Sequence, residues 1–109
     1  MCGYIVSDDL IPQVADTFKL MGDPSRLAIL MLCLDGPMPV GAIALKLSLS
    51  PSLVSHHLRL LRAARLVRSE RRGKQVFYEA EDHHIRCVVA DMMEHAAEEA
   101  GIDTGKSAA

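Results

Sequence analysis

Four side chains of the kind that binds borderline metal ions lie in the last third of the sequence: Asp82, His84, His95 and Glu98. An α-helix rises about 1.5 Å per residue, so His84 and His95 would lie roughly 16 Å apart along one helix axis. Two ligands of the same zinc ion must lie within roughly 4 Å of each other, so one helix cannot close this site. The step between the histidines is close to three helical turns, which puts both imidazoles on one face. We therefore expect metal sites shared by two antiparallel copies, in which the aspartate and first histidine of one chain meet the second histidine and glutamate of the other.

The donor set favours zinc. Two imidazoles and two carboxylates suit tetrahedral coordination, and the same set could hold cobalt. A softer site within one chain is an alternative. Three donors recur at every fourth position, namely Cys87, Asp91 and His95, and His84 could add a further one. In the plainest interpretation none of these residues binds metal: Asp82 only caps a helix, and the others are solvated side chains beside an apolar stripe.

Hydrophobic periodicity predicts the helices that must position these side chains. Apolar residues recur at helical spacing in five segments, near 11–21, 24–34, 40–47, 51–61 and 82–96. Two of these helices begin with a polar cap followed by proline, at Asp23-Pro24 and Ser50-Pro51. The tight turn at 48–50 joins two short helices and completes a helix-turn-helix pattern.

A basic hairpin is expected next. The period changes to two after Arg65, which predicts strands at 66–71 and 75–79 around the turn Arg72-Gly73-Lys74. Between residues 59 and 74 there are seven basic residues and one glutamate, whereas residues 79 to 103 hold eight carboxylates and one arginine. The formal net charge of −2 hides this asymmetry. It predicts a basic contact surface for nucleic acid and a separate acidic element.

Length and composition indicate one small domain. Of the 109 residues, we expect 10–100 to form the domain, 1–9 a loose leader and 101–109 a small polar tail. No apolar run approaches the roughly 18–20 residues of a membrane span, and no signal sequence begins the chain, so we expect a cytoplasmic protein without membrane contact. The three cysteines are widely spaced, which disfavours a disulfide framework.

Three motifs in combination resemble the ArsR/SmtB-type winged-helix repressors. They are residues 23–30, residues 50–61 with the sequence SPSLVSHHLRLL, and Leu66-Val67 with the hairpin turn 71–74. The resemblance spans roughly residues 10–100 and implies a mainly α (α+β) fold, a winged helix-turn-helix of five helices and a two-stranded β-wing. It also implies a homodimer, formed through the first and last helices, that binds operator DNA and releases it when an inducer binds. An enzyme is not expected, because no nucleophile–base arrangement, phosphate loop or cofactor fingerprint is present.

The fourth helix and the wing carry side chains suited to DNA. Small hydroxyls and imidazoles can approach base edges in the major groove, and arginines can reach guanine or phosphate. The expected DNA-contacting residues are Ser52, Ser55, His56, His57, Arg59 and Arg62 in the helix and Arg71, Arg72 and Lys74 in the wing. The wing cations would chiefly set affinity and salt dependence. For His57, a contact within the helix-turn-helix unit is the alternative.

The inducer site varies within this family. The Cys-x-Cys pair that many members use for soft metals would fall at 37–40, where the sequence holds no cysteine. The fifth-helix pattern resembles that of the zinc-sensing branch, and it falls here on Asp82, His84, His95 and Glu98. We therefore expect a repressor that responds to zinc or cobalt, with the backbone near Arg65 relaying metal binding to the recognition helix. Two alternatives remain: a thiol-based redox or persulfide sensor that uses Cys33 and Cys87, and a constitutive DNA-binding protein without an inducer.

Overall fold

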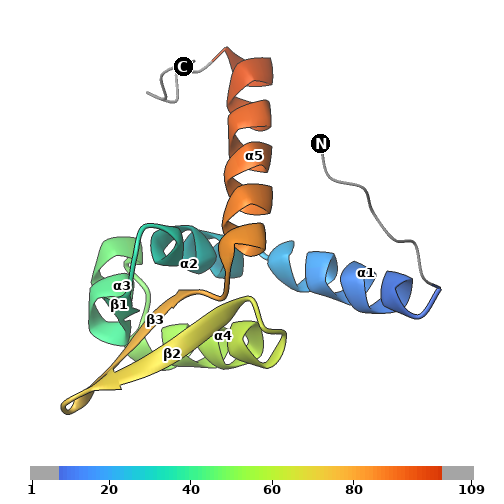
Figure 1. Ribbon diagram of the computed structural model, residues 1–109. Coiled ribbons are helices and arrows are strands. Elements are labelled where there is room, and N and C mark those ends of the chain that lie inside the picture. The colour runs from blue at the N-terminus through green and yellow to red at the C-terminus, as the bar shows by residue number, and fades with distance from the viewer. Residues whose placement is uncertain (1–7, 102–109) are drawn as a thin grey trace.

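The computed structural model describes residues 8–101, which form five helices and three short strands (Figure 1). The helices are α1 (Leu10–Met21), α2 (Pro24–Leu34), α3 (Val40–Leu47), α4 (Pro51–Ala63) and α5 (His83–Ala100). The strands are β1 (Met38–Pro39), β2 (Val67–Arg72) and β3 (Gln75–Ala80). The five helices and the hairpin lie where periodicity predicts them. The expected leader and tail fall almost entirely outside the described residues.

The sheet has three strands, not the two expected for the wing. Strand β3 lies between β1 and β2 and is antiparallel to both, with Met38 opposite Tyr78 and Val67 opposite Ala80. The predicted two-stranded wing is present as β2 and β3, and β1 is a further strand that the sequence did not predict. Since β1 has only two residues, it shows no alternation, and its proline cannot donate a hydrogen bond to the ladder, so it fits only an edge.

Polar caps determine where three of the helices begin. The side chains of Asp23, Ser50 and Asp82 each accept a hydrogen bond from the backbone N–H three residues later, at 3.0, 3.1 and 3.0 Å. Proline follows Asp23 and Ser50, with its φ already suited to the first helical position. The caps thereby satisfy N–H groups that have no partner within the helix. They also set the first turns of α4 and of α5.

An aliphatic core joins α2, α3, α4 and the base of the hairpin. Its fully buried members include Ile29, Leu30, Ile43, Val54, Leu58, Leu61, Leu66 and Val67. Helix α2 lies at the centre and contacts both α4 and β3. Each of these side chains stabilises the fold by roughly 1.5–3 kcal/mol through its removal from water. The core therefore holds α4 firmly by one face and leaves its other face outward.

Helices α1 and α5 extend away from this core (Figure 1). Large apolar side chains remain exposed along both of them, namely Leu10, Ile11, Val14 and Phe18 on α1 and Val88, Met92 and Met93 on α5. Two pockets of about 260 and 220 Å³ lie between the helices, and both are lined by Phe18, Met21, Val88 and Val89. An apolar surface of this extent marks a contact face. None of the helices within residues 8–101 is long and apolar enough to cross a lipid bilayer.

Candidate metal sites and nucleic-acid interface

Asp82 and His84 lie side by side at the beginning of α5. The Asp82 Oδ1 and His84 Nδ1 atoms are 3.8 Å apart, and both side chains are open to solvent. The pKa of Asp82 is lowered, first because its carboxylate accepts the Ile85 N–H and then because of the neighbouring His84 imidazole. The separation of the two donor atoms is within the roughly 4 Å expected for ligands of one zinc ion. This turn therefore presents two compatible donors.

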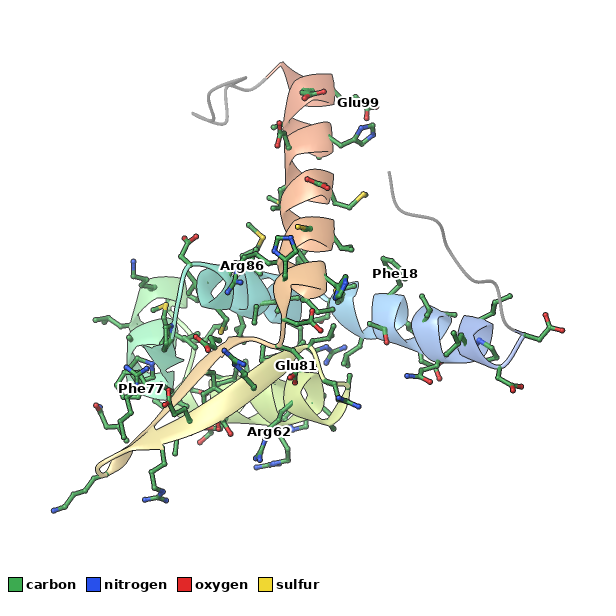
Figure 2. All side chains as sticks on the ribbon, in the orientation of Figure 1. Phe18, Arg62, Phe77, Glu81, Arg86 and Glu99 are labelled. Carbon is green, nitrogen blue, oxygen red and sulfur yellow. The ribbon has the colours of Figure 1, made fainter. Side chains whose placement is uncertain are left out.

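His95 and Glu98 lie in the last turns of α5. The His95 Nε2 atom lies 3.9 Å from an oxygen of Glu99, four residues later, and the expected role of Glu98 as a metal ligand stays a prediction. Figure 2 shows Glu99 near the free end of α5, far from the end of the helix that carries Arg86. Sequence reasoning missed Glu99, although the i, i+4 spacing from His95 was available as a signal. Both glutamates are exposed and can supply a carboxylate oxygen.

The two donor pairs do not meet within one copy of the chain. Among residues 8–101, no three side chains of the metal-binding types lie close enough together to hold an ion. The softer site within one chain is therefore wrong: the Cys87 Sγ atom lies 3.2 Å from Nε2 of His83 and does not gather with Asp91 and His95. Any site that uses all four expected ligands needs a second copy.

The two described cysteines differ in accessibility. Cys33 is fully buried in α2, and burial, with a smaller contribution from Glu79, raises the pKa of its thiol to about 12. Such a thiol is protonated at neutral pH and is a poor nucleophile. Cys87 is half-buried on α5 and is not part of a disulfide. This environment of Cys33 disfavours the thiol-sensing alternative, while Cys2 lies outside the described residues.

The outward face of α4 carries most of the residues expected to contact DNA. Ser52, His56, Arg59 and Arg62 are exposed and Ser55 is half-buried, whereas Val54, Leu58 and Leu61 face the core. Figure 2 shows Arg62 on the outer side of α4. Since α4 contains no acidic residue, nothing in the helix itself opposes the approach of phosphates.

His57 does not lie on that face. Its side chain is only 8% exposed, and its Nδ1 atom has no hydrogen-bond partner. Burial lowers the pKa of His57. The charge of Asp23 acts to raise this pKa, whereas the charges of Arg26 and His56 act to lower it further. The position of His57 in the stripe formed with Val54, Leu58 and Leu61 was a signal of this burial. The burial of His57 therefore favours the alternative, a contact within the helix-turn-helix unit, over a contact with DNA.

Internal contacts order the basic side chains of the wing. Arg72 pairs with Glu70 at 2.9 Å, and its guanidinium lies 5.1 Å from the centre of the Phe77 ring. Arg68, which was not in the expected set, pairs with Glu79 across the two strands at 2.6 Å. Arg71 and Lys74 are exposed. The wing thus keeps its cations outward, with Arg72 held in place by a carboxylate and a ring.

One long-range hydrogen bond ties α5 to the core. Arg86 Nε donates to the backbone carbonyl of Leu34, the last residue of α2, at 2.8 Å. Figure 2 shows Arg86 at the base of α5. The contact spans 52 residues of sequence, and no local pattern indicates it. It links the turn that carries Asp82 and His84 to the helix against which α4 packs.

Arg65 occupies the corner between α4 and β2 in a left-handed conformation. Its φ is +62°, a region that favours glycine. The Leu66 N–H donates to the Leu61 carbonyl at 2.9 Å, which closes the end of the helix. Arg65 also lines the pocket between α1 and α5. A relay through this backbone remains a prediction.

Three comparisons place the chain among known proteins. The family model of the bacterial regulatory proteins of the arsR family matches residues 23–69. The chain is 34% identical over 94 residues to the transcriptional repressor SmtB homolog of Synechocystis, covering 86% of this chain and 71% of that protein. It is 34% identical over 91 residues to a cadmium resistance transcriptional regulatory protein CadC homolog of Staphylococcus aureus, covering 83% and 75%. The solution structure of a homodimeric winged helix-turn-helix domain from Mycobacterium bovis superimposes with a TM-score of 0.81 at 27% identity, covering 98% of this chain and all of that one.

Proposed function

Because this chain belongs to the ArsR family of bacterial regulatory proteins, we propose that it is a metal-responsive transcriptional repressor. It binds operator DNA as a homodimer and releases the DNA when zinc, or cobalt, binds between the C-terminal helices of its two copies. The single observation that carries this proposal is the division of the metal donors between the two ends of α5, where one copy cannot unite them. Its relatives are transcriptional regulators, and we propose no enzymatic activity. A repressor of this kind acts in the cytoplasm.

The exposed apolar face of α1 and α5 supports the homodimer. Seven large apolar side chains lie open on these two helices, and most of the residues that line the pockets between them are apolar. A stable homodimer interface is rich in such side chains. A second copy would remove them from water. The structural relative from Mycobacterium bovis is itself homodimeric.

The basic face of α4 and the wing supports DNA binding. In a helix-turn-helix protein the N-terminal residues of the recognition helix contact base edges in the major groove. Here these residues are Ser52, Ser55 and His56, with Arg59 and Arg62 behind them. The wing adds Arg71, Arg72 and Lys74 for the phosphates.

The donors on α5 fit a borderline metal better than a soft one. Asp82 and His84 are already spaced as ligands of one ion, and His95 and Glu98 offer the same two donor types. Bound zinc would supply a tetrahedral centre whose four ligands come from two chains. The relative named for cadmium resistance is similar over most of its length, but this chain has no cysteine at 37–40. We therefore assign the response to zinc or cobalt.

The coupling between metal and DNA would run through the position of α5. When Asp82 and His84 of one copy share an ion with His95 and Glu98 of the other, the two α5 helices are held in one relative orientation. Arg86 carries that orientation to α2, and α2 packs against α4. If this orientation places the two recognition helices badly for successive major grooves, metal weakens DNA binding and DNA weakens metal binding by the same factor.

Zinc titration of a DNA complex tests the proposal. A labelled duplex selected from a random pool reports binding by fluorescence anisotropy while zinc is added. The wild type should release the duplex, whereas His95→Ala should stay bound. His83→Ala is the matched control, because it removes an exposed histidine of α5 outside the proposed ligand set and should release like the wild type. Release by His95→Ala at wild-type zinc concentrations would refute the site, and DNA affinity indifferent to metal would indicate a constitutive binder.

A further inference from the structure

Two exposed leucines remain after the dimer face is accounted for. Nine large apolar side chains are exposed among residues 8–101, and seven of them lie on α1 and α5. The other two are Leu45 on α3, 83% exposed, and Leu53 on α4, 39% exposed. Both belong to the helix-turn-helix unit, which the dimer face does not include. The dimer face therefore does not account for the exposure of Leu53.

Leu53 stands in the first turn of the recognition helix. Its backbone N–H donates to the Ser50 hydroxyl at 3.1 Å, which orders this turn. Ser52 precedes it, and His56 lies one turn later, so all three exposed side chains occupy the end of α4 that enters the major groove in this type of fold. The next residue, Val54, is fully buried and fixes the rotation of the helix. Leu53 thus lies at the edge of the outward face, between the exposed His56 and the buried Val54, with 39% of its surface exposed.

The major groove offers one apolar group to such a side chain. Among the base edges, only thymine carries a methyl group there, while the other positions present hydrogen-bond donors and acceptors. We infer that Leu53 contacts the methyl group of a thymine and selects for that base in each half-site. This inference rests on the proposed DNA binding. It adds an apolar specificity contact to the hydroxyls, imidazole and arginines of α4.

Selection from a random duplex pool, followed by removal of the methyl group alone, tests the inference. Wild type, Leu53→Ala, Leu53→Met and the control Leu45→Ala are each used for selection. The wild type should enrich a thymine in each half-site. Replacing the thymine of one half-site by deoxyuridine should weaken wild-type binding by about fourfold, as expected for one buried methyl group. Leu45→Ala and Leu53→Met should keep the preference, because both retain at position 53 an apolar side chain long enough to reach the methyl group, whereas alanine is too short.

Leu53→Ala should bind the thymine and deoxyuridine duplexes equally and should enrich no base at that position. Circular dichroism confirms that each variant is folded, which is expected because Leu53 and Leu45 are not core residues. Equal wild-type affinity for the two duplexes, or an unchanged preference in Leu53→Ala, would overturn the inference while leaving DNA binding intact. A pool from which the wild type enriches no sequence would overturn the proposed operator binding, and the leucine contact with it.

Discussion

Replacing Arg65 by glycine should stabilise the protein. Arg65 has a φ of +62°, and a side chain with a Cβ atom in the left-handed region raises the energy by roughly 1–2 kcal/mol. Glycine removes that strain but loses about 0.5–1 kcal/mol through the greater freedom of the unfolded chain. The net gain in the free energy of unfolding therefore lies between about 0 and 1.5 kcal/mol, with a central value of roughly 0.75 kcal/mol. With a urea m-value of about 2 kcal/mol/M, this central value should raise the unfolding midpoint by about 0.3–0.5 M.

The matched control for this substitution is Arg62→Gly. It removes the same side chain and charge one turn earlier, inside α4, where the backbone is helical. There, glycine should lower the free energy of unfolding by about 1 kcal/mol. Urea unfolding followed by circular dichroism, at one fixed protein concentration because a dimer is expected, separates the two variants. If Arg65→Gly were destabilised as much as Arg62→Gly, the strain argument would be wrong.

Three further predictions concern the imidazole, the helix link and the wing. Because the pKa of His57 is lowered in the folded protein, the unfolded chain binds protons more readily, and the free energy of unfolding should fall as the pH drops below about 6.5. In urea unfolding between pH 7.5 and 5, His57→Leu should lose part of this pH dependence, and His56→Leu should keep it. Arg86→Ala removes the hydrogen bond to α2 and should reduce the zinc-induced loss of DNA affinity by at least severalfold. Its affinity for DNA without metal should stay within about twofold of wild type, and an unchanged effect of zinc in anisotropy titrations would exclude this link. Arg71→Ala should weaken binding to all sequences alike and lower the slope of log affinity against log salt by about one, whereas a change in preferred sequence would show that Arg71 reads bases.

The sequence predicted the helices and the hairpin well because the contacts that begin and end them join residues close together in the sequence. The caps at Asp23, Ser50 and Asp82 are each completed by a backbone N–H only three residues away. Strand β1 escaped prediction because two residues show no period, and its partner β3 lies about forty positions later. The burial of His57 could have been predicted, because it falls in the same helical stripe as Val54 and Leu58.

The candidate site shows the same division between local and long-range information. The pairing of Asp82 with His84 is a short-range consequence of one helical turn. The bond from Arg86 to Leu34 has no counterpart in any sequence pattern, since the two residues meet only after α2 and α5 have packed on the core. The choice between Glu98 and Glu99 depends on a second copy of the chain, because both glutamates follow His95 on nearly the same face.

Complementation between two defective copies tests the shared metal sites most directly. One variant, Asp82→Ser with His84→Ala, keeps a helix cap but lacks the first donor pair, and the other, His95→Ala with Glu98→Ala, lacks the second. Heterodimers purified through two different affinity tags are titrated with cobalt, whose absorption reports tetrahedral coordination, and with zinc. If the sites are shared between chains, the wild type should bind two ions per dimer, each homodimeric variant none tightly, and the heterodimer one, because one complete set of donors is restored. A heterodimer that binds no ion tightly, or a homodimeric variant that still binds two, would contradict the account.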